Sequence, residues 1–242
     1  MNAMNKFALT CLSLLFALPS RAQQAAPEGW QLSGDIGAGL NAAPTPARAR
    51  SNQTAPIPYL NFDAGPIFAR IDTFGVKLLP AGAGHVELLT RVLSDGYTPR
   101  DAAGGGQRRS DALPLGLGTL QVTPAGAFMF NVYHDLGKSH GQLADFMYAA
   151  ELDAGPVALY PQAGLEYRSA AYLRYYDGTA NYQPGAASSP FAALFAEVHL
   201  AGAWYVNGNL RRSWLGKPVQ DSPLVRRAKV DSGLLALSYR FN

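Results

Sequence analysis

Cysteine, charge and long apolar runs are all scarce in this 242-residue sequence. Cys11 is the only cysteine, and it lies in an apolar stretch near the N-terminus. The remainder of the chain therefore forms no disulfide and supplies no thiolate metal ligand. Charged residues make up 15% of the sequence, and no apolar run of 18 residues follows the first 22 positions. The sequence therefore predicts no transmembrane helix beyond that point.

The first 22 residues have the pattern of a secretory signal peptide. Lys6 supplies a positive charge, residues 7–19 are mostly apolar, and Ser20 and Arg21 precede Ala22. A charged start, a short apolar stretch and a small-x-small end are typical of cleavage after Ala22. The alternative is a buried N-terminal helix. We expect a signal peptide over residues 1–22 and a mature domain over residues 23–242.

The balance of charge excludes the basic footprint of a nucleic-acid-binding protein. The net charge is +3, and 18 basic residues face 17 acidic residues once the predicted signal peptide is removed. What the sequence has in abundance is glycine and aromatic residues, with 25 Gly, 12 Tyr and 11 Phe. Such a composition favours closely paired strands with girdles of aromatic residues over a helical protein.

Apolar and polar residues alternate with a period of two in segment after segment. The last of these places Leu235, Leu237 and Tyr239 opposite Ser238 and Arg240. This period indicates strands with one apolar face, which points inward in a soluble barrel and outward in a membrane barrel. The predicted signal peptide, which directs the chain across the inner membrane, favours the membrane barrel. So does a strand length of about ten residues, which is longer than usual in soluble sheets. So do the aromatic residues near strand ends, namely Trp30, Tyr167, Trp204, Trp214, Tyr239 and Phe241.

The predicted fold is all-β, a transmembrane antiparallel β-barrel in the outer membrane. Only a closed sheet leaves no unpaired edge in lipid, and bacterial barrels have even strand numbers. We predict twelve strands, or ten if the short early strands merge, and a soluble lipocalin-like barrel is the structural alternative. The predicted strands cover 29–40, 55–63, 65–71, 73–79, 84–94, 112–122, 126–135, 142–152, 156–169, 190–201, 203–214 and 230–241. Long polar stretches at 42–55, 95–110, 177–189 and 216–229 alternate with short turns, so we expect them to be outer loops.

Candidate catalytic and metal-binding residues are few. The histidines His85, His134, His140 and His199 have no metal-ligand spacing. A hydrolase would use His134 and Asp135 beside Ser139 and His140. Adjacent strand residues point to opposite faces, so His134 and Asp135 cannot easily act together, and a turn-capping role is favoured. We predict no catalytic, cofactor-binding or metal-binding residues.

Charged residues on the polar face of the strands have two interpretations. They line a water channel, or they form ion pairs that fill the lumen. Mixed signs in a barrel of about twelve strands favour ion pairs, because open lumens are typical of barrels nearer sixteen strands. These residues are Asp35, Glu87, Arg91, Glu151, Glu166, Arg168, Glu197, Arg211 and Arg240.

Several motifs together resemble the MltA-interacting protein (MipA) / OmpV family of outer-membrane proteins. Tyr176-Asp177-Gly178 follows a strand predicted to end in Tyr172 and Arg174. Residues 211–216 lead to Asp221-Ser222-Pro223-Leu224-Val225 and a closing strand that ends in Tyr239-Arg240-Phe241. His134-Asp135 and Pro58-Tyr59 also fit the family pattern. The closing strand resembles the signal read by the barrel-assembly machinery, although Asn242 follows the aromatic Phe241.

The resemblance implies a function that is not catalytic. Family members are regarded as scaffolds that link a lytic transglycosylase to a penicillin-binding protein in murein metabolism. Others are associated with adhesion or permeability. The expectation is therefore an outer-membrane scaffold with outer-membrane lipid around it and no cofactor. A narrow pore, an adhesion protein and an outer-membrane hydrolase are the alternatives.

Overall fold

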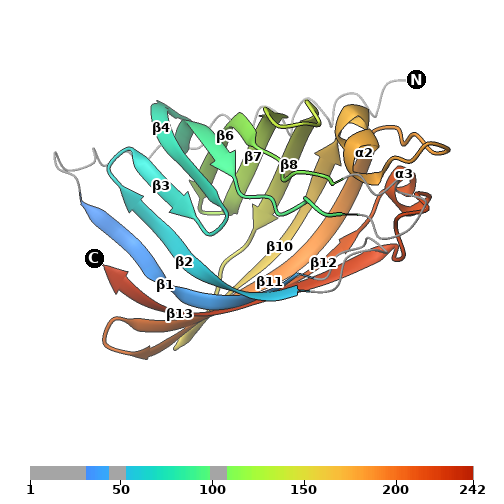
Figure 1. Cartoon of the computed structure of the whole chain (residues 1–242). Helices are drawn as coiled ribbons and strands as arrows, with labels where there is room; N and C mark the ends of the chain where they lie inside the picture. The colour runs from blue at the N-terminus through green and yellow to red at the C-terminus, as the bar shows by residue number, and fades with distance from the viewer. Residues whose placement is uncertain (1–30, 44–52, 99–107, 242) are drawn as a thin grey trace, which may run out of the picture.

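The computed structural model describes residues 31–43, 53–98 and 108–241, and this part of the chain is built almost entirely of strands (Figure 1). The strands are β1 (Leu32–Ala43), β2 (Gln53–Ala64), β3 (Ile67–Arg70), β4 (Thr73–Ala81), β5 (Gly84–Arg91), β6 (Pro114–Thr123), β7 (Gly126–Asp135), β8 (Gln142–Ala149), β9 (Leu152–Ala154), β10 (Val157–Arg168), β11 (Ala187–Ala201), β12 (Trp204–Trp214) and β13 (Lys229–Phe241). Two short helices are α2 (Ala170–Asp177) and α3 (Lys217–Gln220). The predicted signal peptide and Trp30 lie outside the described residues.

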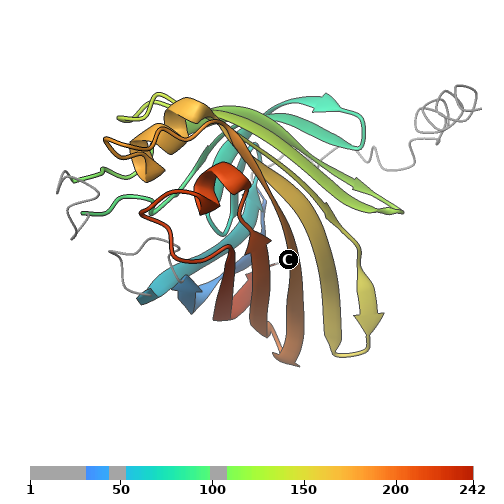
Figure 2. The same ribbon diagram turned by 90° about the vertical axis from the view of Figure 1, so that its right-hand side faces the viewer.

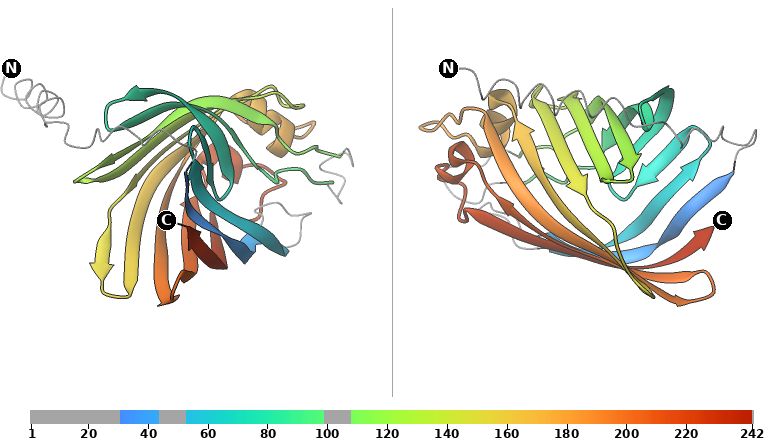
Figure 3. Two further views of the ribbon diagram at one scale, coloured as in Figure 1. Left: turned by 90° about the vertical axis from the view of Figure 1, so that its left-hand side faces the viewer. Right: turned by 180° about the vertical axis from the view of Figure 1, so that it is seen from behind.

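The strands close into a ring of antiparallel pairs. From β1 to β8 and from β10 to β13, each strand pairs with the next, and β13 returns to pair with β1. Strands β8 and β9 lie end to end along β10 and occupy one position in the wall. Within the described residues the barrel therefore has twelve strands, which confirms the predicted number. Seen from behind, β10 to β13 run side by side along the barrel (Figure 3).

The predicted strand 142–152 is divided in two because of a proline on the opposite strand. The carbonyl oxygen of Pro161 accepts a hydrogen bond from the backbone nitrogen of Ala150 at 3.1 Å. Pro161 therefore points its backbone toward β8 and β9, but it has no N–H to donate in return. The ladder breaks at Ala150 and resumes at Leu152. Proline in the wall thus sets the position of the break.

Prolines also lie along one edge of β2. The β3–β4 hairpin is short, so β2 pairs with β3 only from Asn61 to Ala64. The carbonyl oxygen of Leu60 accepts a hydrogen bond from the backbone nitrogen of Ile71 at 2.6 Å. The backbone N–H and C=O groups of even-numbered β2 residues therefore point toward the β3 side of the strand. Pro56 and Pro58 therefore turn their nitrogens to this edge, where no described strand pairs with them. Neither residue leaves an unpaired N–H there.

Large apolar side chains cover the outside of the wall. Leu210 is 71% exposed and Leu235 is 60% exposed, whereas the inward Asp35 and Asn207 are at most 1% exposed. Trp204 packs against Tyr239 at one end of β12, and Trp214 pairs with Lys229 at the other. At about 3.3 Å per residue and a tilt of about 40°, the 11-residue β12 rises roughly 25 Å, the height of a membrane barrel's apolar band. The apolar face points outward, as the membrane interpretation predicts.

The two ends of the barrel differ in the length of their connections. Tight turns with glycines at positive φ, including Gly65, Gly82 and Gly202, lie at the end where the chain terminates. The opposite end carries the long loops and both helices (Figure 2). Longer loops mark the outer end. In the described residues no helix has the length and apolar character needed to cross a membrane.

One predicted element is wrong. The strand predicted over 156–169 ends at Arg168 as expected, but Tyr172 and Arg174, which the motif comparison placed at the end of a strand, lie in α2. The side-chain oxygen of Ser169 accepts a hydrogen bond from the backbone nitrogen of Tyr172 and so caps the helix. Serine is among the preferred N-cap residues, because its side chain satisfies a backbone donor of the first turn.

Candidate functional site: the lumen and its outer cap

The lumen near the inner end is occupied by an ion pair between the first and last strands. The Arg240 guanidinium on β13 donates to both carboxylate oxygens of Asp35 on β1, from Nε and Nη2, each at 2.8 Å. Its Nη2 also donates to Glu197 on β11. The same guanidinium lies 3.9 Å above the ring centre of Tyr205. Arg240 thus ties three strands together inside the wall.

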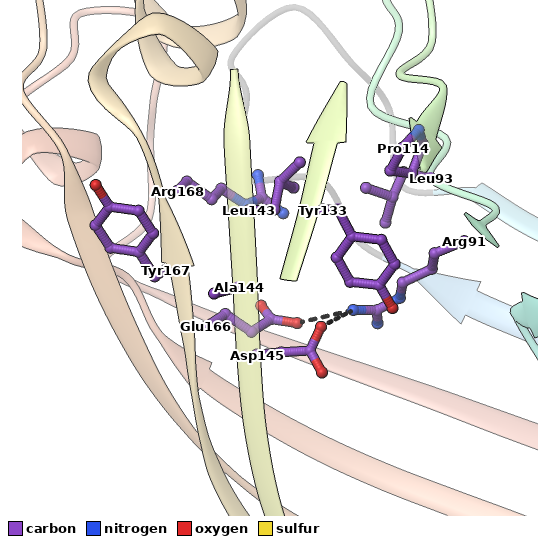
Figure 4. A pocket seen from close by; sticks show the side chains of 10 residues that line it. All are labelled: Arg91, Leu93, Pro114, Tyr133, Leu143, Ala144, Asp145, Glu166, Tyr167 and Arg168. Carbon is purple, nitrogen blue, oxygen red and sulfur yellow. Dashed lines mark ion pairs between the residues drawn. The ribbon is translucent and has the colours of Figure 1, made fainter. Parts of the chain in front are cut away.

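A second set of ion pairs crosses the lumen at the level of Arg91. The Arg91 side chain on β5 bonds Asp72 at 2.8 Å and lies 3.6 Å from a carboxylate oxygen of both Asp145 on β8 and Glu166 on β10 (Figure 4). Glu166 also pairs with Arg211 on β12 at 2.9 Å. In the ring of twelve, β5 and β12 are six positions apart and therefore face each other. These contacts connect opposite walls.

The cavity among these charged groups is small, whereas a larger hollow of about 480 Å³ lies beside it against mostly outward-facing residues of β7, β8 and β10. A cavity of about 20 Å³ lies between Arg91, Tyr133, Asp145 and Glu166, and it has room for about one water molecule. Tyr167 points away from the charged groups in the same view (Figure 4). In a third ion pair, Arg70 on β3 donates to both carboxylate oxygens of Glu87 on β5, at 2.8 and 2.6 Å. Side chains therefore occupy the lumen at this level.

The outer mouth is covered by α2, which packs on an apolar cluster. Tyr172, Leu173 and Tyr176 are all at most 3% exposed. They pack with residues that the strands and the other loops supply, namely Phe68, Leu89, Tyr133, Leu143, Ala187, Val219 and Val225. Burial of aromatic and aliphatic side chains is the main force that holds such a cover in place. We call α2 and the loops that pack around it the outer cap.

Hydrogen bonds between loops fasten the outer cap. The Tyr172 hydroxyl donates to Asp95 at 2.5 Å, and the Tyr176 hydroxyl donates to the carbonyl of Ser110 at 2.9 Å. The Ser222 hydroxyl donates to the carbonyl of Asp177 at 2.6 Å. The loops after β5, β10 and β12 are therefore bonded to one another.

One carboxyl group in the outer cap has a raised pKa. Burial raises the pKa of Asp177 to about 6, since the surrounding protein disfavours its charged form. The Arg168 guanidinium acts in the opposite direction, and the Asp95 carboxylate reinforces the rise in the pKa. Burial and Asp95 also raise the pKa of Tyr172, so its hydroxyl stays protonated as a donor.

Of the four residues weighed for hydrolysis, Asp135 and Ser139 contact each other, but neither histidine joins them. Asp135 accepts hydrogen bonds from the backbone nitrogens of Leu113 and Gly137, each at 2.8 Å, and from the Ser139 hydroxyl. This is the predicted turn-capping role. His134 lies on the exposed face of the same strand, and His140 is an exposed residue at positive φ. Among the described residues, no group of three or more His, Cys, Asp or Glu side chains is placed to hold a metal ion.

Most of the predicted inward charges are paired. The exception is Glu151, which is exposed and accepts a hydrogen bond from Tyr160 at 3.1 Å. Four partners of these charges were not predicted, namely Arg70, Asp72, Asp95 and Asp145. Asp145 alternates with apolar Phe146 and could have been found from that pattern, whereas Arg70 lies in a strand too short to show a period.

A closed antiparallel wall, apolar outside and charged inside, defines an outer-membrane β-barrel. The chain belongs to the family described as "MltA-interacting protein MipA", which it matches over residues 36–241. It is also similar to the Escherichia coli K12 protein named "Putative outer membrane protein YiaT", with 24% identity over 94% of this chain and 96% of that protein. The protein of the same name from E. coli O157:H7 matches to the same extent. The protein is therefore located in the outer membrane.

Proposed function

We propose that this barrel is a non-catalytic scaffold for enzymes of murein metabolism. The observation that carries the proposal is the ion-pair network that joins Arg91 to Arg211 through Glu166 across the lumen. A lumen bridged in this way suits a rigid body that presents its surface to partners better than it suits a conduit. The family description, which names interaction with MltA, supports a lytic transglycosylase as one partner. A penicillin-binding protein is proposed as the second.

The inner end is the surface proposed for these partners, because murein and its enzymes lie on that side of the outer membrane. Its connections are tight turns that hold exposed positions such as Ala83 and Ala125 in fixed places. The Ala125 carbonyl accepts a hydrogen bond from Tyr148, and the Ala83 nitrogen donates to Gln121. A rigid surface reduces the entropy lost on binding.

Site-specific photo-crosslinking tests this proposal. A photoreactive residue replaces Ala83 or Ala125 at the inner end, and matched controls replace Lys138 or Asp221 in the outer loops. Cells that express the full chain are irradiated, and adducts are identified by mass spectrometry. Adducts with a lytic transglycosylase or a penicillin-binding protein from inner positions alone support the scaffold. Adducts absent from inner positions, in cells that contain both enzymes and the folded barrel, contradict it.

A further inference from the structure

Four basic residues gather at the outer end of the β12–β13 hairpin. Lys217, Arg226, Arg227 and Lys229 are all exposed, and we call them the cationic rim. The segment 215–231 contains two acidic residues, Asp221 and Asp231. Asp231 already binds Arg212, which donates to its two carboxylate oxygens at 2.6 and 2.9 Å. The cationic rim therefore has a local excess of positive charge.

The cationic rim lies directly above lipid-facing surface. Trp214 and Lys229 form a cross-strand pair, and side chains of such a pair share one face of the sheet. Leu210 and Leu235, which are exposed on this face, lie closer to the inner end of the same hairpin. The backbone nitrogen of Leu215 donates to the carbonyl of Ala228 at 2.9 Å, so the loop closes at its base.

The cross-strand pair of Trp214 and Lys229 also indicates the height of the cationic rim in the membrane. Tryptophan concentrates at the boundary between hydrocarbon and headgroups. Trp204 and Tyr239 mark the inner boundary on this hairpin. At the other end, the apolar face ends at the outward-facing Arg212–Asp231 pair, one cross-strand pair on that face before Trp214 and Lys229. Lys229 is level with Trp214, and Arg226 and Arg227 precede it in the loop, so these cations meet the headgroup layer of the outer leaflet.

The wall below the cationic rim leaves room for an acyl chain. Gly208 is on the lipid-facing side between Val206 and Leu210. A Cβ atom at this position would meet nothing nearer than the Leu234 carbonyl oxygen at 3.9 Å. The lipid-facing surface of the hairpin is therefore lower here than at the leucines around it.

We propose that the cationic rim binds a phosphorylated glycolipid of the outer leaflet. Lysine and arginine bind phosphate oxygens through charge-assisted hydrogen bonds, and basic clusters at membrane surfaces recognise anionic headgroups. The acyl chains of the glycolipid lie along the apolar face of β12 and β13. An acidic protein would satisfy the charges but would make no use of Trp214, the leucines and the open position at Gly208. Phosphate above and acyl chains below match both parts of the surface.

Competition binding with the full-length barrel in detergent micelles tests this proposal. The probe is fluorescent lipid A that carries two phosphates, displaced by unlabelled lipid A, by the same lipid without phosphates, or by phosphatidylglycerol. The wild type is expected to bind phosphorylated lipid A at least tenfold more tightly than lipid A without phosphates or phosphatidylglycerol. The double variant Arg227→Gln/Lys229→Gln is expected to bind phosphorylated lipid A about tenfold more weakly. A tenfold change in Kd corresponds to about 1.4 kcal/mol of binding free energy.

A matched variant controls for general electrostatic attraction. Lys138→Gln/Arg174→Gln removes two exposed cations from other outer loops and is expected to keep wild-type affinity. An unchanged difference in migration between unheated and heated samples shows that each variant is folded. Equal losses in the two double variants overturn the proposal. So does equal binding of lipid A with and without phosphate, or tighter binding of polyglutamate than of lipid A.

Discussion

Arg240 and Asp35 are 205 positions apart in the sequence, and two parallel hydrogen bonds of 2.8 Å join them where the last strand meets the first. Asp35 is 1% exposed. Bidentate geometry between guanidinium and carboxylate is strong because both donors and both acceptors are aligned. The closure of the barrel therefore has a buried polar contact in addition to its backbone ladder.

Arg240→Gln is expected to weaken the barrel substantially. It leaves the carboxylates of Asp35 and Glu197 close together without their cation. Removal of one partner from a fully buried pair costs about 3–5 kcal/mol, because the remaining charge is uncompensated. The Arg240 side chain is 28% exposed, so the expected loss lies at or below the lower end of that range. Urea unfolding in micelles, followed by tryptophan fluorescence, measures the change. Arg212→Gln, which breaks the exposed pair with Asp231, is the control and is expected to change stability little. Equal losses for both would contradict the role of Arg240.

Pro58→Val is expected to destabilise the barrel even though valine favours strands. The substitution adds an N–H at the edge of β2 that no described strand pairs with. An unpaired donor away from water costs about 1–3 kcal/mol. Leu60→Val, on the same face of β2, is the matched control, because leucine and valine both carry a backbone N–H. The temperature at which the folded gel band disappears measures the effect. A rise in that temperature for Pro58→Val would refute this explanation of the proline.

Asp177 is expected to make the stability of the outer cap depend on pH. Its pKa rises from an ordinary value of 3.8 to about 6 in the folded chain. The folded state prefers the protonated form, so stability falls as pH rises from about 4 to about 6 and stays low above 6. The loss of stability is about 3 kcal/mol, because one pKa unit corresponds to about 1.4 kcal/mol.

Asp177→Asn is expected to remove this dependence and to increase protection of the α2 amides at pH 7.5. Hydrogen exchange with mass spectrometry, corrected for intrinsic rates, measures it. Asp221→Asn, an exposed acid in the neighbouring loop, is the control. Weaker protection of Asp177→Asn than of the wild type at pH 7.5 would disprove the raised pKa.

Cleavage after Ala22 is expected from the N-terminal pattern of charge, apolar stretch and small residues. Protein extracted from the outer membrane should then begin at Gln23. N-terminal sequencing of the mature chain decides this. A chain that retains Met1, or that begins elsewhere, would contradict the predicted cleavage.

The wall could be predicted from sequence because its pattern is local. Alternation of apolar and polar residues, as at Leu235 and Ser238, is the same in every barrel strand and needs no knowledge of the partner strand. The break between β8 and β9 could not be found this way. It depends on Pro161, which lies on another strand and becomes relevant only once the register is known.

The outer cap and the ion pairs were harder to predict for different reasons. The residues that cover the lumen in α2 are mainly tyrosines, which are common in strands, so the segment after Arg168 looked extended. Ser169 followed by apolar residues at positions 172, 173 and 176 was the available signal for a capped helix. The charged residues were predicted to pair, but which carboxylate meets Arg91 depends on how the barrel closes.

Single-channel recording in planar lipid bilayers tests the central claim, that side chains close the lumen, most directly. The full-length protein is refolded, checked for its heat-dependent gel shift, and inserted at neutral pH in 1 M salt. We expect no regular conductance steps, because Arg91, Glu166 and Arg211 bridge the walls beneath the outer cap. Uniform steps from the wild-type protein would show a continuous water path. They would contradict the closed lumen and favour the narrow pore.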